Sequence, residues 1–162
     1  QGGQPIMSYN FGAGNKERVK KAFFTQFKVC TIFTSCFWLI MLLFPKLFAG
    51  IFSNNTDLIT YTAWALRIYM AGIFSLGFQV SCQQSFMALG QAKVSLLLAC
   101  LRKLILLIPL IFILPVFIQD KVFAVFLAEP ISDIVAATIT TITFMSRFNG
   151  ILNKGSKMKT VE

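Results

Sequence analysis

Residues 29–52 read VCTIFTSCFWLIMLLFPKLFAGIF, an apolar stretch whose only charged side chain is Lys46. As an α-helix with a rise of 1.5 Å per residue, this stretch is about 36 Å long, which exceeds the roughly 30 Å hydrocarbon core of a bilayer. Three further, mainly apolar stretches follow at residues 58–89, 95–118 and 122–144. The sequence therefore predicts an all-α membrane protein with four transmembrane helices.

The composition argues against a soluble protein or an enzyme. Of the 162 residues, 56% are apolar and only 13% are charged, whereas soluble domains carry about 25% charged residues. The chain has no histidine and no Gly-x-Ser-x-Gly motif, which argues against a membrane hydrolase as well. The four cysteines show no CxxC spacing, so we expect neither a metal site nor a cofactor.

The positive charges predict how the chain lies in the membrane. Twelve of the 15 lysines and arginines lie in residues 14–28, in residues 91–103 and after residue 144, which four alternating helices place on one side of the bilayer. By the positive-inside rule this side is the cytoplasm. Both ends of the sequence, including a frayed polar tail at residues 145–162, are therefore predicted to be cytoplasmic. Because topology explains the net charge of +9, we expect no nucleic-acid partner.

Four residues of the second predicted span share one helical face. They are Gly72, Ser75, Gln79 and Gln83, at spacings of three and four residues. Amides inside a bilayer need partners or water, so this face is expected to line either another helix or a wet cavity. Small residues favour close helix packing, and a cavity wall would satisfy the amides as well. The residues leave both alternatives open.

Two carboxylates lie one helical turn apart in the fourth predicted span. Glu129 is eight residues beyond Lys121, which places it about 12 Å deep, and Asp133 shares its face. Arg67 reaches nearly the same depth on the second span, so we expect an ion pair between Arg67 and one of these carboxylates. The alternative is that the carboxylates couple transport to a proton or another cation, and pairing that changes with protonation would combine both roles.

The third predicted span contains both charges and prolines. Its most apolar part, LILLIPLIFILPVFI at residues 104–118, has only 15 residues, so the helix must extend back through Arg102 and Lys103. We expect these two cations near one end of the helix, with their charged groups at the interface. We also expect a kink near Pro109 and Pro115.

The segment before the first span is amphipathic. Asn15 is expected to cap a helix that begins with KERVKKAFFTQFK, whose lysines and arginine lie among lipid headgroups. Phe23, Phe24 and Phe27 are expected to point into the acyl boundary. Membrane lipid is therefore a predicted partner.

Four segments resemble one transporter family, in the family's order. They are QPIMSYNFGAGNKERVK, LRIYMAGIFSLGFQVSCQQSFMALGQAKVSL, the stretch from Arg102 to Pro109, and EPISD. Over essentially its whole length the sequence resembles the C-terminal part of the multidrug and toxic compound extrusion (MATE) family. Because the first residue is Gln1, we expect a piece of a longer protein. By this resemblance residues 1–10 end helix 8, and the four spans are helices 9 to 12.

The resemblance implies a twelve-helix, two-bundle transporter of the plasma membrane that exports drugs and cationic organic molecules in exchange for protons or sodium ions. Its partners would be lipid, the missing N-terminal bundle, the drug and the coupling ion. The family's tenth helix faces the central cavity, which makes Gln79 and Gln83 candidate substrate contacts. The sodium-coupled branch has an acidic residue in that helix, which residues 58–89 lack, and the other branch has its essential carboxylate in the first helix. Glu129 and Asp133 match the acidic pattern of the twelfth helix.

Two alternatives fit the same four helices. A related flippase of lipid-linked saccharides would need inward-facing cations to hold pyrophosphate, and Arg67 is the only deep cation that the sequence predicts. A small four-helix protein could instead act as a structural membrane subunit, which an upstream reading frame with eight more spans would exclude.

Overall fold

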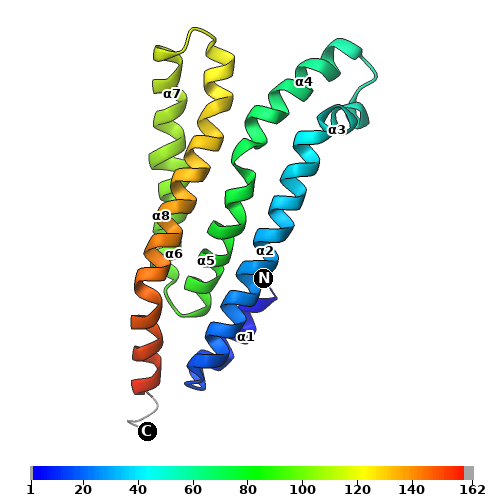
Figure 1. Ribbon diagram of the computed structural model, residues 1–162. Coiled ribbons are helices and arrows are strands. Elements are labelled where there is room, and N and C mark those ends of the chain that lie inside the picture. Colours follow the sequence, from blue (N-terminus) through cyan, green and yellow to red (C-terminus); the bar gives the residue numbers. More distant parts are fainter. Residues whose placement is uncertain (1, 159–162) are drawn as a thin grey trace.

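The computed structural model describes residues 2–158, with side chains to residue 153, and this part of the chain consists of helices joined by short turns (Figure 1). Four helical runs are long and apolar enough to cross a membrane, at Lys16–Leu43, Thr56–Ala88, Ala92–Phe117 and Lys121–Asn153. The predicted all-α fold with four transmembrane helices is confirmed. In chain order the elements are α1 (Gly3–Gly12), α2 (Lys16–Leu43), α3 (Pro45–Phe52), α4 (Thr56–Tyr69), the 3₁₀ segment η1 (Met70–Ser75), α5 (Leu76–Ala88), α6 (Ala92–Cys100), the π-helical segment η2 (Leu101–Leu107), α7 (Ile108–Phe117) and α8 (Lys121–Met158).

The turns alternate between the two ends of the molecule. The α1–α2 turn, the α5–α6 turn and the end of α8 lie together at one end, and the α3–α4 loop and the α7–α8 turn lie at the other (Figure 1). Gly14 and Gly90 occupy two turns at the first end with φ of 72° and 73°, a left-handed conformation that favours glycine. This end, called the basic end below, carries Lys16, Arg18, Lys20 and Lys21 at the start of α2, Lys93 at the start of α6 and Arg147 in the last part of α8.

The stretch predicted as one span at residues 29–52 is divided between two helices. Pro45 has no N–H to donate and disfavours helical geometry at Phe44, whose φ and ψ are −123° and 46°. α2 therefore ends at Leu43, and α3 starts again at Pro45. At its other end α2 begins at Lys16, so the amphipathic segment and the first span are one continuous helix.

The C-terminal tail is more ordered than the sequence predicts. α8 continues without interruption from the fourth span to Met158, so the expectation of a frayed segment from residue 145 is wrong over the part that the structure describes. Residues 159–162 of the predicted tail lie outside the described residues.

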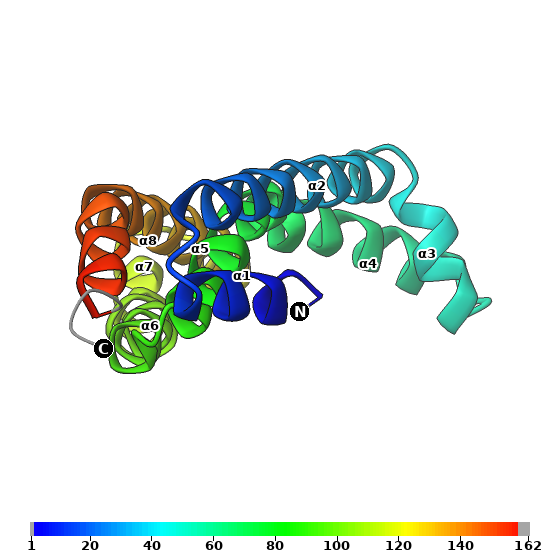
Figure 2. The same cartoon turned by 90° about the horizontal axis from the view of Figure 1, so that it is seen from below.

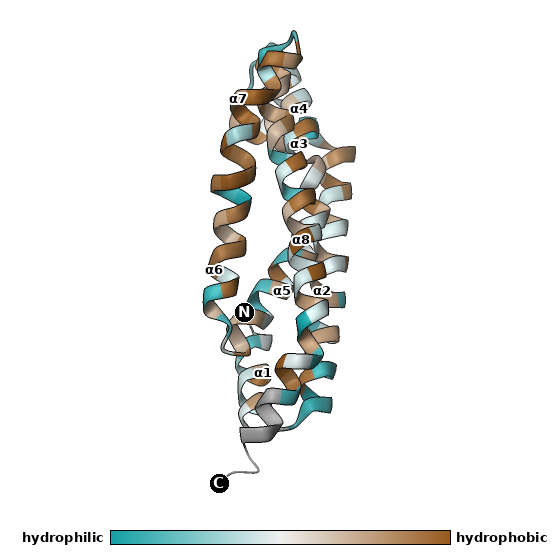
Figure 3. Cartoon of the chain, turned by 90° about the vertical axis from the view of Figure 1, so that its left-hand side faces the viewer, coloured by the Kyte–Doolittle hydropathy of each residue, from teal (hydrophilic) through white to brown (hydrophobic). Residues whose placement is uncertain are grey.

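The second span lies in the middle of the structure. α5 and η1 pack against α2 on one side and against α8 on the other (Figure 2). α7 packs against α8, and α6 packs against α5. α6 and α7 consist mainly of hydrophobic residues (Figure 3), many of them exposed: Leu96 of α6 is 67% exposed and Phe117 of α7 is 81% exposed. Such surface suits a bilayer or further helices rather than water.

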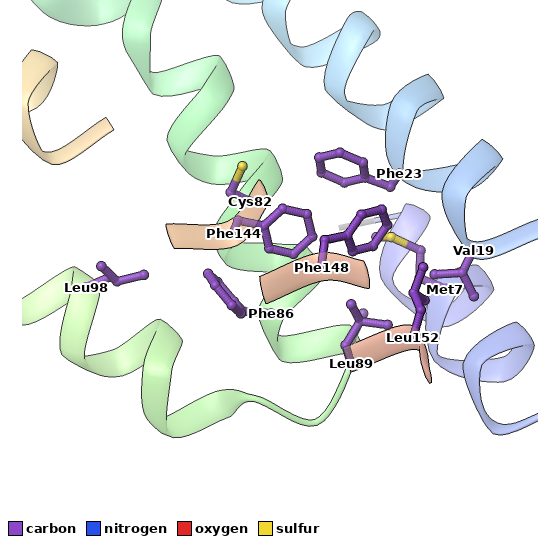
Figure 4. Packing of buried hydrophobic residues seen from close by; sticks show 11 residues of the cluster. Met7, Val19, Phe23, Cys82, Phe86, Leu89, Leu98, Phe144, Phe148 and Leu152 are labelled. Atoms are coloured by element: carbon purple, nitrogen blue, oxygen red, sulfur yellow. The ribbon is translucent and has the colours of Figure 1, made fainter. Parts of the chain in front are cut away.

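A buried aromatic cluster near the basic end connects α1, α2, α5, α6 and α8 (Figure 4). The ring of Phe144 lies 4.7 Å from that of Phe23 and 4.9 Å from that of Phe86, measured between centroids. Phe23 is fully buried, so the prediction that it points into the acyl boundary is wrong, whereas Phe24 is 46% exposed. The reason is that α8 and α5 present their own phenylalanines to this face of α2.

The start of α2 is also held differently from the prediction. The Asn15 side chain makes no capping hydrogen bond, so the expected cap is wrong. Instead the backbone N–H of Asn15 donates to the carbonyl oxygen of Asn10 at 2.9 Å, and Lys16 donates from its Nζ to Asn153 at 2.9 Å. Backbone hydrogen bonds in the tight α1–α2 turn therefore fix the entry into α2.

Candidate functional site

Two carboxylates and two cations meet between α8 and the middle of the third span. Arg102 donates from Nε to Asp133 Oδ1 at 2.6 Å, and its Nη2 lies 3.7 Å from Glu129 Oε1. Lys103 donates from Nζ to Glu129 Oε1 at 2.7 Å. The side chains of Asp133 and Glu129 are only 3% and 11% exposed. These four residues, called the charge cluster below, balance two positive charges with two negative ones far from either helix end.

The backbone of the third span explains how two consecutive cations reach the same helix. Neighbouring residues of an α-helix point about 100° apart, but Arg102 and Lys103 lie in the π-helical segment η2, where more residues per turn bring neighbours closer in direction. Pro109 follows shortly after η2 and lacks the N–H that would continue the α-helical ladder. In the region where the sequence predicts a kink, the structure therefore has a widened helical turn.

The prediction of an ion pair with Arg67 is wrong. Arg67 is exposed and takes part in no ion pair within the described residues. Instead α4 meets α8 through aromatic rings, with the centroid of Trp64 6.3 Å from that of Phe123 and the centroid of Tyr69 6.4 Å from that of Phe126. Depth along a helix is independent of rotation about the helix axis, and rotation decides which side chain faces α8.

Arg102 and Lys103 are the functional residues that the sequence reading missed. The sequence predicts them near one end of a helix, with their charged groups at the interface, but Arg102 is ten residues from the start of the Ala92–Phe117 span. Its side chain is 20% exposed, and its guanidinium binds the carboxylate of Asp133. The available signal was charge balance, because two cations and two carboxylates inside neighbouring apolar spans each need a partner.

Gly72 fixes the distance between the second span and α8. A Cβ atom at this position would lie 2.8 Å from Pro130 Cα and 3.2 Å from Asp133 Cβ, so only glycine fits without a shift of the backbone. Ser75 donates from Oγ to the carbonyl oxygen of Gly72 at 2.7 Å. The 3₁₀ segment η1 therefore packs directly beside the charge cluster.

The other residues of the predicted stripe have different surroundings. Gln79 is 1% exposed, and its Oε1 has no hydrogen-bond partner within the described residues. Ser75 lines a groove of about 250 Å³ between α5 and α8. Gln83 donates from Nε2 to the Ser95 carbonyl oxygen at 3.4 Å and lines a groove of about 320 Å³ between α5 and α6. Helix packing thus describes Gly72, Ser75 and Gln79, which are buried, and only Gln83 of the stripe is partly exposed.

The chemistry that these side chains offer is non-covalent. No group of three or more histidine, cysteine or acidic side chains that could hold a metal ion is found among the residues described. The charge cluster can form and break ion pairs, and the grooves offer apolar walls with a few hydroxyl and amide groups. Such surfaces suit binding and helix movement rather than bond-making chemistry.

Comparison with known proteins places this arrangement in a structural context. The sequence model of the MatE family matches residues 1–113. The structures of the inward-facing and outward-facing conformations of a multidrug resistance MATE family transporter of the MOP superfamily match with TM-scores of 0.84 and 0.83, each at 18% sequence identity. Each match covers 92% of this chain and 34% of the other chain.

A third structure has higher sequence identity. The structure of the MATE multidrug transporter DinF-BH in complex with rhodamine 6G matches with a TM-score of 0.81 at 30% identity, over 92% of this chain and 33% of that chain. The chain thus spans about a third of the length of each of these transporters. No curated protein matches the chain.

Proposed function

Because the chain belongs to the MatE family, we propose that it forms the C-terminal part of a multidrug exporter of the plasma membrane. The observation that carries this proposal is the likeness, over nearly the whole chain, to a multidrug transporter in complex with rhodamine 6G. In the complete protein this part packs beside an N-terminal bundle, and the two bundles alternate between inward-facing and outward-facing arrangements. Neither the flippase nor the structural subunit is favoured by these likenesses.

The proposed substrates are drug-like and cationic organic molecules. Ser75 and Gln83 both line grooves, but Ser75 is only 3% exposed, so Gln83 is the proposed polar contact, and apolar and aromatic walls supply the rest of the binding surface. Gly72 and Gln79 serve the same site indirectly, because they hold the second span against its neighbours. Few polar contacts on an apolar surface favour broad recognition over selectivity.

The proposed driving force is exchange with a proton or a sodium ion. Glu129 and Asp133 are buried carboxylates, and cations neutralise both in the structure. An ion that bound to either carboxylate would compete with Arg102 or Lys103 and would loosen the third span from α8. The basic end, which holds the α1–α2 turn and the described end of α8, is proposed to face the cytoplasm.

The test is substrate transport by the complete protein that carries this sequence. Inverted membrane vesicles that contain the protein should accumulate rhodamine 6G when a proton or a sodium gradient is imposed, and vesicles without the protein should not. Glu129→Gln should reduce gradient-driven uptake. Glu17→Gln, which neutralises an exposed carboxylate outside the charge cluster, is the matched control and should not reduce uptake. Rhodamine 6G accumulation that depends on neither gradient would contradict antiport. Equal uptake by the two variants would contradict a role for Glu129.

A further inference from the structure

A groove between α1 and α2 at the basic end has no role in the proposed transport cycle. It has a volume of about 570 Å³, within the range of small-molecule sites. α1 folds back beside the first half of α2 (Figure 2), so the groove has one wall from each helix. The wall on α2 is a single helical face, at spacings of three and four residues. The positions on this wall that matter here are Arg18, Lys21, Thr25, Gln26, Val29 and Cys30.

The polarity of the groove changes along its length. At the basic end its wall carries the cations Arg18 and Lys21, and Thr25 follows one turn further along. Toward the middle of the molecule the wall becomes apolar, with Val29 61% exposed and Ile6 of α1 55% exposed. Eleven residues separate Arg18 from Val29, which is about 16 Å along the helix. Val29 begins the apolar stretch at residues 29–52, so the groove extends from the basic segment of α2 to the edge of the predicted span.

The two cations at the mouth of the groove have no counter-ion among the residues that the structure describes. Neither Arg18 nor Lys21 takes part in an ion pair within residues 2–153. The facing helix α1 has the sequence GQPIMSYNFG, which contains no acidic residue. Glu17 is the nearest acid in sequence, but it is not part of the groove wall. An anion at this position would therefore satisfy charges that the described part of the chain leaves unpaired.

We propose that this groove binds one anionic phospholipid from the leaflet at the basic end. The phosphate accepts hydrogen bonds from Arg18 and Lys21, and one acyl chain lies along Val29 and Ile6. A soluble anion would leave the apolar half of the groove uncovered, and a cationic drug would be repelled by the two unpaired cations. An anionic lipid satisfies both ends of the groove at once.

The experiment uses the complete protein, purified into detergent with equal amounts of phosphatidylglycerol and phosphatidylcholine, and counts retained lipids by native mass spectrometry. The unaltered protein should retain one phosphatidylglycerol in preference to phosphatidylcholine. Arg18→Gln with Lys21→Gln should weaken this retention by about tenfold or more, because charge-assisted hydrogen bonds are lost. The matched control is Lys20→Gln with Lys93→Gln, which removes two cations toward the same end from positions outside the groove wall.

Three results would overturn the proposal. Equal retention by the double variant and its control would mean that the attraction is general surface electrostatics. No preference for phosphatidylglycerol in the unaltered protein would mean that another part of the complete protein occupies the groove. A Val29→Trp variant keeps both cations and fills the apolar half from an exposed position, so it should also reduce retention. Unchanged lipid retention in this variant would contradict the acyl-chain contact and therefore the proposed mode of binding.

Discussion

Replacing Arg102 with methionine should leave Asp133 as an unpaired carboxylate inside the bundle. Its side chain is 3% exposed, and in the structure it accepts a 2.6 Å hydrogen bond from Arg102. Removing one partner of a buried ion pair costs about 3–5 kcal/mol of folding free energy. This loss should appear as a lower melting temperature, because the shift in melting temperature is proportional to the change in folding free energy. The assay heats the detergent-purified complete protein to a series of temperatures. Size-exclusion chromatography then measures the fraction that remains folded at each temperature.

A double variant separates the ion pair from general damage to the helix. Arg102→Met with Asp133→Asn removes both charges, so it should be more stable than Arg102→Met alone, and the interaction energy should appear in the double-mutant cycle. Arg67→Met is the control, because Arg67 is exposed and has no ion pair among the described residues; its effect should stay within about 0.5 kcal/mol. Equal destabilisation by Arg67→Met and Arg102→Met, or additive effects in the cycle, would refute the reasoning.

Two further substitutions test the packing. Gly72→Ala places a Cβ atom 2.8 Å from the backbone of Pro130 and should cost about 1–3 kcal/mol, measured as a lower melting temperature. Gly50→Ala, where no atom lies within 4 Å of the added Cβ, is the matched control and should be neutral or stabilising; equal losses would contradict the close approach. Phe144→Ala removes the ring that touches both Phe23 and Phe86 and should cost about 3–5 kcal/mol in the same assay, whereas a loss below about 1 kcal/mol would show that the aromatic cluster does not hold the helices together.

The number of transmembrane helices could be predicted because it depends on length and hydrophobicity. Residues 29–52 and the three later stretches are long and apolar enough to indicate spans without any knowledge of packing. Their boundaries were less accurate, because Pro45 interrupts the first stretch while α2 extends back to Lys16 through polar residues. Hydrophobicity predicts where a helix can enter lipid, but it does not predict where the backbone stops being helical.

The partners within the candidate site could not be predicted in the same way. The depth of Glu129 follows from the helical rise per residue. Its partner depends on the rotation of each helix about its own axis, and the depth gives no information about that rotation. The π-helical turns at η2 change that rotation for Arg102 and Lys103, and no periodic signal in the sequence indicates them. The close contact at Gly72 was foreseen only as one of two alternatives, because a small residue suits a packed interface and a cavity wall equally well.

Glycines on two sides of the second span restrict how it can move. Gly72 allows close approach to α8, and at Gly77 a Cβ atom would lie 3.0 Å from the backbone of Cys30 and Thr31 in α2. A slide by one residue would put Ile73 or Phe78 where a hydrogen atom now fits, so α2, α5 and α8 have to travel as one block. The third span meets this block through apolar side chains of α6 and α7 and, at η2, through the charged side chains of Arg102 and Lys103, which can exchange partners without a steric clash. Of the contacts between the third span and α8, the charge cluster is therefore the one where helix movement would meet the least steric resistance.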